Sequence, residues 1–220
     1  MRKKVDKIRH TTELLPLLRD PHCEFVLLRS CLALPKVMFL LRALDTSEHT
    51  DLLENFDSIT RGALSKILGA AVSDDQWLQA KLPAAMGGLG LRAAEDHTPV
   101  AFAASLLASK KLVHNLLGKA DDDEVPPSLP QPVLDKISLK MGEQASTESL
   151  TGVSQKAASL KVDLLNQSIL LNHIIEEGQV SKTARLRSLG LHLRATEFVP
   201  CLGVPIFAAN STCPSCSAHE

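Results

Sequence analysis

The sequence predicts an all-α fold: an irregular helical bundle with a second, smaller helical segment and a poorly ordered C-terminal tail. Three observations support this prediction. Hydrophobic residues make up 45% of the 220 residues, and most of them are leucine and alanine, which favour helix over strand. In the longest segments apolar residues recur at steps of three and four, which is the spacing of one helix face. No period of about 20 to 50 residues is visible, which excludes a repeat array.

The N-terminal stretch is predicted to form successive short helices. Apolar residues indicate a helix over residues 5–19, which the pair Asp20-Pro21 ends. The same pair can start the next helix, because proline is tolerated in a first turn. That helix covers residues 24–33, Pro35 interrupts it, and residues 36–44 resume it.

The clearest predicted helix covers residues 47–68. Thr46 or Ser47 can cap its start, and Gly69 stands where a left-handed C-terminal residue belongs. Acidic residues recur at every third position around its start, so they wind around the first turns instead of lining one face. We expect them to be solvated and to complement the helix N-terminus, with a paired-carboxylate site as the lesser alternative; they are Asp45, Glu48, Asp51, Glu54 and Asp57.

The middle of the chain is predicted to hold two helices joined by a glycine-rich loop. Residues 73–83 form a short capped helix that its final proline stops. Residues 87–92, with the sequence GGLGLR, form a flexible loop. Residues 99–117 form a second strong helix, which Gly118 ends.

The remaining chain is predicted to contain a linker and three more helices. Residues 121–132 are acidic and rich in proline, which is typical of a linker. Helices follow over residues 133–141, 152–175 and 181–193. The second of these has so wide an apolar surface that we expect it to be covered on two sides, the first of them formed by Val153, Ala157, Leu160, Leu164, Leu171 and Ile175. The predicted domains are therefore a helical thumb-like domain (1–118), a linker (119–132), a helical segment (133–199) and a tail (200–220).

Composition excludes several classes of protein. The net charge of −1 excludes nucleic-acid binding through the overall charge of the protein and leaves only local basic patches as candidates. Aromatic residues are only 3% and tyrosine is absent, so no base-stacking platform is expected. The most apolar stretch, residues 25–44, contains charges and Pro35 and is expected to be a buried soluble segment without membrane contact. Five cysteines without a secretory signal favour an intracellular location, cytoplasmic or nuclear.

No motif in the chain predicts an enzyme. Asp74-Asp75 precedes a helix, and a helix start explains this pair better than a two-metal polymerase site. The GGLG stretch lacks the lysine and serine or threonine of a phosphate-binding loop. Cys213, Cys216 and His219 have the spacing of an incomplete zinc half-site, and Cys201 is an unusual fourth ligand. We therefore expect no cofactor, with zinc in this tail as the alternative.

Several stretches in order resemble one known family. They are FVLLRSCLALPK (25–36), QWLQAKLPAAMGGLGLR (76–92), AFAASLL (101–107), RATEF (194–198), LGVP (202–205) and CPSC (213–216). The order resembles the region downstream of the reverse transcriptase palm in non-LTR, LINE-like retrotransposon polyproteins of animals. The resemblance covers nearly the whole chain, and the block at residues 76–92 is its most specific part.

The resemblance implies a non-catalytic fragment of such a polyprotein, the thumb and linker that help to hold template RNA and nascent DNA. In the family the catalytic carboxylates lie upstream of the segment that matches Met1, and the zinc knuckle continues beyond the CPSC pair. The residues expected to contact phosphate weakly and in a salt-sensitive way are Arg29, Lys36, Arg42, Lys182, Arg185, Arg187 and Arg194. Their alternative role is solvated helix surface.

Two alternatives to nucleic-acid binding remain. The chain can be a helical protein-interaction module, whose apolar faces bind the polymerase palm, a helical partner or another copy. It can also be a genomic remnant without a selected function, which the physics of the sequence does not exclude.

Overall fold

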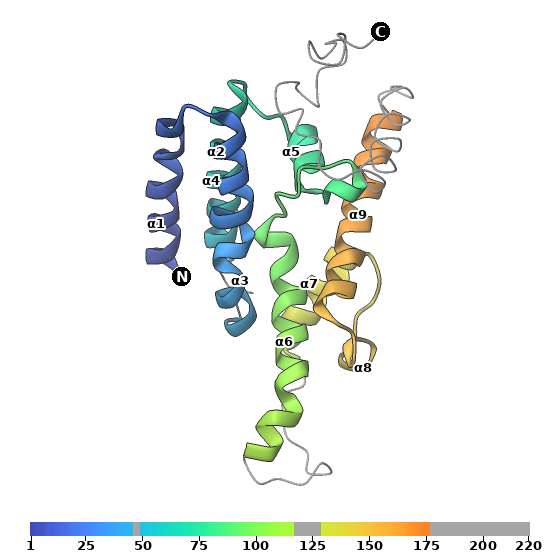
Figure 1. Cartoon of the computed structure of the whole chain (residues 1–220). Helices are drawn as coiled ribbons and strands as arrows, with labels where there is room; N and C mark the ends of the chain where they lie inside the picture. Colours follow the sequence, from blue (N-terminus) through green and yellow to red (C-terminus); the bar gives the residue numbers. More distant parts are fainter. Residues whose placement is uncertain (46–48, 117–128, 177–220) are drawn as a thin grey trace.

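The computed structural model describes residues 1–45, 49–116 and 129–176. In this part of the chain all regular secondary structure is helical, which confirms the predicted all-α class (Figure 1). None of the helices in these ranges is both long enough and apolar enough to cross a bilayer. The predicted helix at 181–193, the tail at 200–220 and most of the predicted linker lie outside the described residues.

The helices vary widely in length, and α6 stands in the middle of the molecule. It packs against α3 and α4 on one side and against α7 and α9 on the other (Figure 1). Short 3₁₀ turns cover Leu15–Leu18 and Ala84–Met86, and a π turn covers Leu28–Leu32. The α-helices are α1 (Arg2–Glu13), α2 (Pro21–Leu27), α3 (Leu34–Ala43), α4 (Thr50–Leu68), α5 (Asp74–Lys81), α6 (Ala94–Leu116), α7 (Gln131–Met141), α8 (Thr147–Leu150) and α9 (Gln155–Glu176).

Local signals explain the breaks between the first three helices. Asp20 caps α2 with its carboxylate, which accepts hydrogen bonds from the backbone N–H groups of His22 and Cys23. Arg19 just before it has a φ of 53°, which ends the preceding turn. Pro35 lies in the first turn of α3, so the interruption falls at Ala33. The predicted first helix was too long at its C-terminal end, because α1 stops at Glu13.

The C-terminal end of α4 and the start of α5 follow their sequence signals closely, whereas His49, which caps the start of α4, makes no side-chain cap hydrogen bond. Gly69 adopts the left-handed conformation after α4, with a φ of 65°, as predicted. The start of α4 is at Thr50, later than predicted. Ser73 caps α5 in a reciprocal arrangement with Gln76, and Asp74 follows in the first turn.

The start of α6 was wrong in the prediction by five residues. The helix begins at Ala94, and Pro99 lies inside it instead of at its beginning. Pro99 is the sixth residue of α6, so it lies beyond the first turn, and it has no N–H to donate to the carbonyl of Glu95 four residues earlier. A side chain from α4 caps the earlier start, as described below.

Only one of the two apolar sides of α9 is covered by the described residues, whereas the prediction had both covered. Its buried side faces α5, α6 and α7 and consists of Ala158, Ser159, Val162, Asp163, Leu170 and Ile174. The other apolar side is not covered by the described residues: Leu160, Leu164 and Ile175 are 48%, 50% and 53% exposed. The expectation that α9 is covered on both sides is therefore wrong for the described part of the chain.

The apolar cores on the two sides of α6 meet along this helix. Ala94 packs with a core formed by α1, α3 and α4, whose largest members are Ile8, Leu41 and Phe56. Val100 and Ala103 pack with the core from α7, α8 and α9. Leu129 is buried in this second core, just before α7 begins. Residues from both sides of the predicted linker thus share one core.

Candidate functional site

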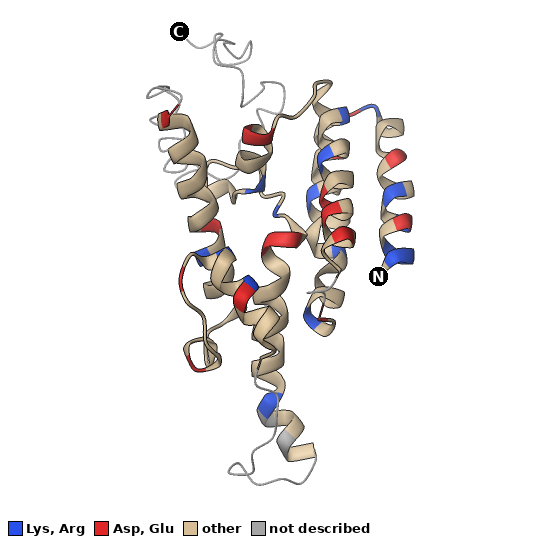
Figure 2. Cartoon of the chain, turned by 180° about the vertical axis from the view of Figure 1, so that it is seen from behind, with Lys and Arg blue, Asp and Glu red and all other residues tan. Residues whose placement is uncertain are grey.

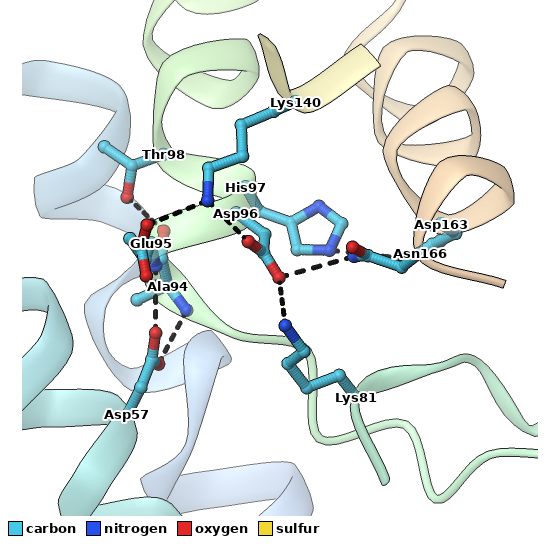
Figure 3. A network of polar contacts seen from close by, with 10 residues as sticks. All are labelled: Asp57, Lys81, Ala94, Glu95, Asp96, His97, Thr98, Lys140, Asp163 and Asn166. Carbon is cyan, nitrogen blue, oxygen red and sulfur yellow. Dashed lines mark hydrogen bonds and ion pairs between the residues drawn. The ribbon is translucent and has the colours of Figure 1, made fainter. Parts of the chain in front are cut away.

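The first turn of α6 is held by a carboxylate from another helix. The backbone N–H groups of Ala94 and Glu95 donate to the two carboxylate oxygens of Asp57 at 2.7 and 3.0 Å (Figure 3). These N–H groups have no partner within their own helix, so Asp57 of α4 satisfies both. Burial raises the pKa of Asp57 to about 7, although the two hydrogen bonds oppose this shift. The expectation that Asp57 is solvated is wrong, because it faces α6.

Next to this cap, Asp96 collects donors from three other segments. Its carboxylate pairs with the ammonium groups of Lys81 at 2.7 Å and Lys140 at 2.9 Å, and the amide of Asn166 donates to it at 3.3 Å (Figure 3). Lys140 also reaches Glu95 at 2.8 Å. Burial alone would raise the pKa of Asp96, but the two lysines outweigh it and lower this pKa to about 2. The carboxylate is therefore ionised and paired.

A second buried carboxylate, that of Asp163, lies on α9 one helix turn before Asn166. Asp163 is 1% exposed, and the guanidinium of Arg92 donates to its Oδ2 at 2.5 Å. Its Oδ1 lies 3.4 Å from Nε2 of His97, beyond good hydrogen-bonding distance. Oδ1 of Asp163 and Nδ1 of His97 are both buried and have no hydrogen-bond partner within the described ranges. This pair is the least satisfied part of the polar network.

The chemistry of the network indicates a structural junction. His97 and Asp163 form a buried histidine–carboxylate pair, and among the described residues Nδ1 of His97 has no hydrogen-bond partner. Within the described ranges, no three His, Cys, Asp or Glu side chains are placed to hold a metal ion. The network instead ties α4, α5, α6, α7 and α9 together with paired charges (Figure 3).

A pocket opens beside the junction, between α4, α6 and α7. Its apolar walls come from Leu53, Pro99, Phe102 and Val133. Lys140 lines it as well, but the ammonium group is committed to Glu95 and Asp96. The pocket therefore offers an apolar surface more than a charged ligand site.

Three of the basic residues predicted to contact phosphate lie in the described part of the chain. Arg29 is half-buried on the π turn, and its guanidinium packs beside Gly90. Lys36 is exposed on α3, and Arg42 at the end of that helix donates to the side chain of Gln155 on α9 at 2.7 Å. Outside the described residues lie the other predicted site residues: Lys182, Arg185, Arg187, Arg194, Cys213, Cys216 and His219.

The sequence prediction missed the junction itself. One of its members had a signal in the sequence, because Asp163 interrupts an apolar helical stretch between Val162 and Leu164, whereas Asp96 and His97 lie within the polar run at residues 95–98. A charge at a core position is rarely buried unless it is paired, so such an interruption predicts a partner. The identity of the partners depends on contacts 70 residues apart, as between Asp96 and Asn166.

The exposed surface carries an unusual number of large apolar side chains. Leu17 is 76% exposed on the 3₁₀ turn after α1, and Val26 and Leu27 on the adjacent α2 are also exposed. The C-terminal end of α6 exposes Leu112 and Leu116. In the described part of the chain, α9 also exposes apolar side chains on the side opposite its buried one. We define the α9 stripe as Leu160, Leu164, Leu171 and Ile175, of which Leu171 is half-buried.

The chain was compared with protein-family models, curated proteins and solved structures. No family model, no curated protein and no solved structure matches this chain.

Proposed function

We propose that this chain is a non-catalytic helical docking module that binds an amphipathic partner helix along the α9 stripe. The observation that carries the proposal is that α9 has two apolar sides, of which only one packs against the described part of the protein. The other side presents leucine and isoleucine at helical spacing over four turns. Such unpaired apolar surface is typical of an interaction site.

The form of the stripe supports a helix as the partner. Leu160 and Leu164, and again Leu171 and Ile175, are separated by four residues, so all four side chains fall on one side of the helix. A second amphipathic helix fits such a narrow seam, because its side chains can insert between these leucines. The buried side of α9 holds the helix in place through Arg92 and Asp163, so the stripe is presented rigidly.

The proposal is tested with a labelled synthetic peptide helix that carries leucine at its heptad a and d positions. We expect saturable binding by fluorescence anisotropy, and a loss of binding when Leu164→Gln shortens the apolar seam. The matched control is Leu17→Gln. Leu17 is also exposed, but it lies on the 3₁₀ turn after α1 and is not part of the α9 stripe. Binding that is absent, or equal in the two variants, would show that the stripe is not the docking site.

A second candidate function is weak binding to the phosphate backbone of RNA or DNA. Residues 1–43 contain nine lysines and arginines but four aspartates and glutamates. Much of this excess lies on α1, the helix at the N-terminus, whose Lys and Arg residues are blue in Figure 2. Lys3 and Lys7 on this helix are exposed and lie one turn apart. The resemblance to the region after a reverse transcriptase palm supports the same role, because that region helps to hold template and product.

Anisotropy with a labelled single-stranded RNA distinguishes this candidate. The affinity should fall steeply with added salt, and each phosphate contact should add about −0.7 to the slope of log K against log salt. Replacing Lys3 and Lys7 by alanine should lower the slope, whereas replacing Lys36 alone should change it less. Binding without salt dependence would exclude backbone contact by this surface.

A further inference from the structure

We infer that the helix bound along the α9 stripe is α9 of a second copy of this chain, packed antiparallel to the first. This inference rests on the proposed docking function and adds the identity of the partner. It follows from the order of apolar and polar residues along the exposed side of α9.

The α9 stripe is symmetric about its own centre. The intervals between Leu160, Leu164, Leu171 and Ile175 are four, seven and four residues, so the pattern is the same in both chain directions. When two such helices pack antiparallel, Leu160 of one copy faces Ile175 of the other, and Leu164 faces Leu171. A self-complementary patch of this kind is what a two-fold symmetric dimer requires.

The residues at the centre of the stripe fit a two-fold axis. Gln167 and Ser168 flank the midpoint, so the packing that places Leu164 opposite Leu171 also places Gln167 of one copy opposite Ser168 of the other. The amide of Gln167 can donate to the hydroxyl oxygen of the facing Ser168. Ser168 is small and already donates its hydroxyl to the carbonyl of Leu165 at 2.7 Å, so it leaves no unsatisfied donor at the contact.

The charges at the two ends of α9 favour the antiparallel orientation. Lys156 and Lys161 lie near the N-terminal end of the helix, and Glu176 is its last residue. Lys161 also pairs with Glu143 of its own chain. Antiparallel packing brings the lysines of one copy to the C-terminal end of the other, where the helix dipole is negative. Parallel packing would bring lysine to lysine and align the two dipoles.

The size of the seam predicts a weak dimer. The stripe spans fifteen residues, or about 22 Å of helix at 1.5 Å per residue. A single helix pair of this length falls short of the roughly 1,200–2,000 Å² that stable interfaces bury. We therefore expect a dissociation constant in the micromolar range, about 1–100 μM, so the full chain should shift from monomer to dimer with concentration.

Sedimentation equilibrium of the full chain over a concentration series tests self-pairing. We expect a monomer–dimer equilibrium that Leu164→Lys weakens by about tenfold or more, which corresponds to about 1.4 kcal/mol. The control variant Leu17→Lys should leave the equilibrium unchanged, because it adds the same charge on another exposed surface. A chain that stays monomeric throughout, or a Leu164→Lys variant that dimerises like the wild type, would overturn the inference.

A pair of compensating variants tests the orientation. Leu160→Lys and Ile175→Glu should each weaken the dimer, and the two changes in one chain should restore it, because antiparallel packing places the new lysine opposite the partner's new glutamate. The two positions are about 22 Å apart within one helix, so they cannot compensate inside one chain. A double variant that is no stronger than either single variant would refute antiparallel pairing.

The peptide experiment separates failure of this inference from failure of the proposed function. A monomeric chain that still binds the synthetic helix through Leu164 keeps the docking function and loses self-pairing. A monomeric chain that binds neither the peptide nor an apolar dye at the stripe shows that another part of the chain covers it, which overturns both. A dimer that the peptide dissociates supports both.

Discussion

Replacing Gly88 by alanine should strongly destabilise this protein, because the loop at residues 87–90 leaves no room for a Cβ atom. An ideal Cβ at Gly88 would lie 2.1 Å from the carbonyl oxygen of Leu82 and 2.5 Å from that of Gln79. Both atoms belong to the backbone, and real Cβ atoms essentially never approach closer than 3.0 Å. The loop would therefore have to move by roughly 1 Å, a shift typical of an overpacked site.

The loop cannot move without loss of the contacts that position it. The N–H of Gly90 donates to the carbonyl of Leu82 at 2.8 Å, and the side chain of Gln79 donates to the carbonyl of Gly87 at 3.0 Å. Overpacking costs about 1–3 kcal/mol and each lost hydrogen bond about 0.5–1.5 kcal/mol. We therefore expect Gly88→Ala to lower the free energy of unfolding by about 3 kcal/mol or more, which lowers Tm by roughly 6–12 °C.

Gly62→Ala is the matched control for this change. Gly62 lies inside α4, is exposed, and has no heavy atom within 4 Å of an added Cβ. Glycine in a helix interior costs roughly 0.5–1 kcal/mol relative to alanine, so this variant should be slightly more stable than the wild type. Urea unfolding followed by circular dichroism at 222 nm measures both. A Gly88→Ala variant within about 0.5 kcal/mol of the wild type would refute the reasoning.

Three further predictions concern the junction and a helix cap. Asp57 holds a proton in the folded protein at pH values where the unfolded chain, with a pKa of 3.8, has released it. Its contribution to stability therefore falls as the pH rises from about 4 to about 7, by at most about 4 kcal/mol, and Asp57→Asn should flatten this slope in urea titrations repeated across that range. Asp96→Ala leaves Lys81 without its carboxylate partner and should lower the free energy of unfolding by about 3–5 kcal/mol in the same assay. Glu143→Ala, which removes the exposed pair with Lys161, should lower it by less than about 1 kcal/mol. Equal losses in the two variants would contradict the buried pairing. Ser73→Ala removes the cap of α5 and should cost about 1 kcal/mol, and no change in the urea midpoint would mean that the cap is not needed.

Local features of the fold were predictable from the sequence by itself. Asp20, Gly69 and Ser73 act on backbone groups within a few residues of themselves, so their identity alone predicts where a helix begins or ends. The all-α class follows from composition and spacing for the same reason, since helical hydrogen bonds join residues four apart.

Only the tertiary structure decided where α6 begins and which side of α9 is buried. The cap of α6 comes from Asp57, which is 37 residues away from Ala94, and no local pattern predicts such a contact. Both sides of α9 carry apolar residues, so periodicity cannot choose between them. The buried side is the one on which Val162, Leu170 and Ile174 pack into the core clusters and on which Arg92 pairs with the buried Asp163. The α9 stripe is left exposed on the described surface because a helix can present only one side to the same neighbours.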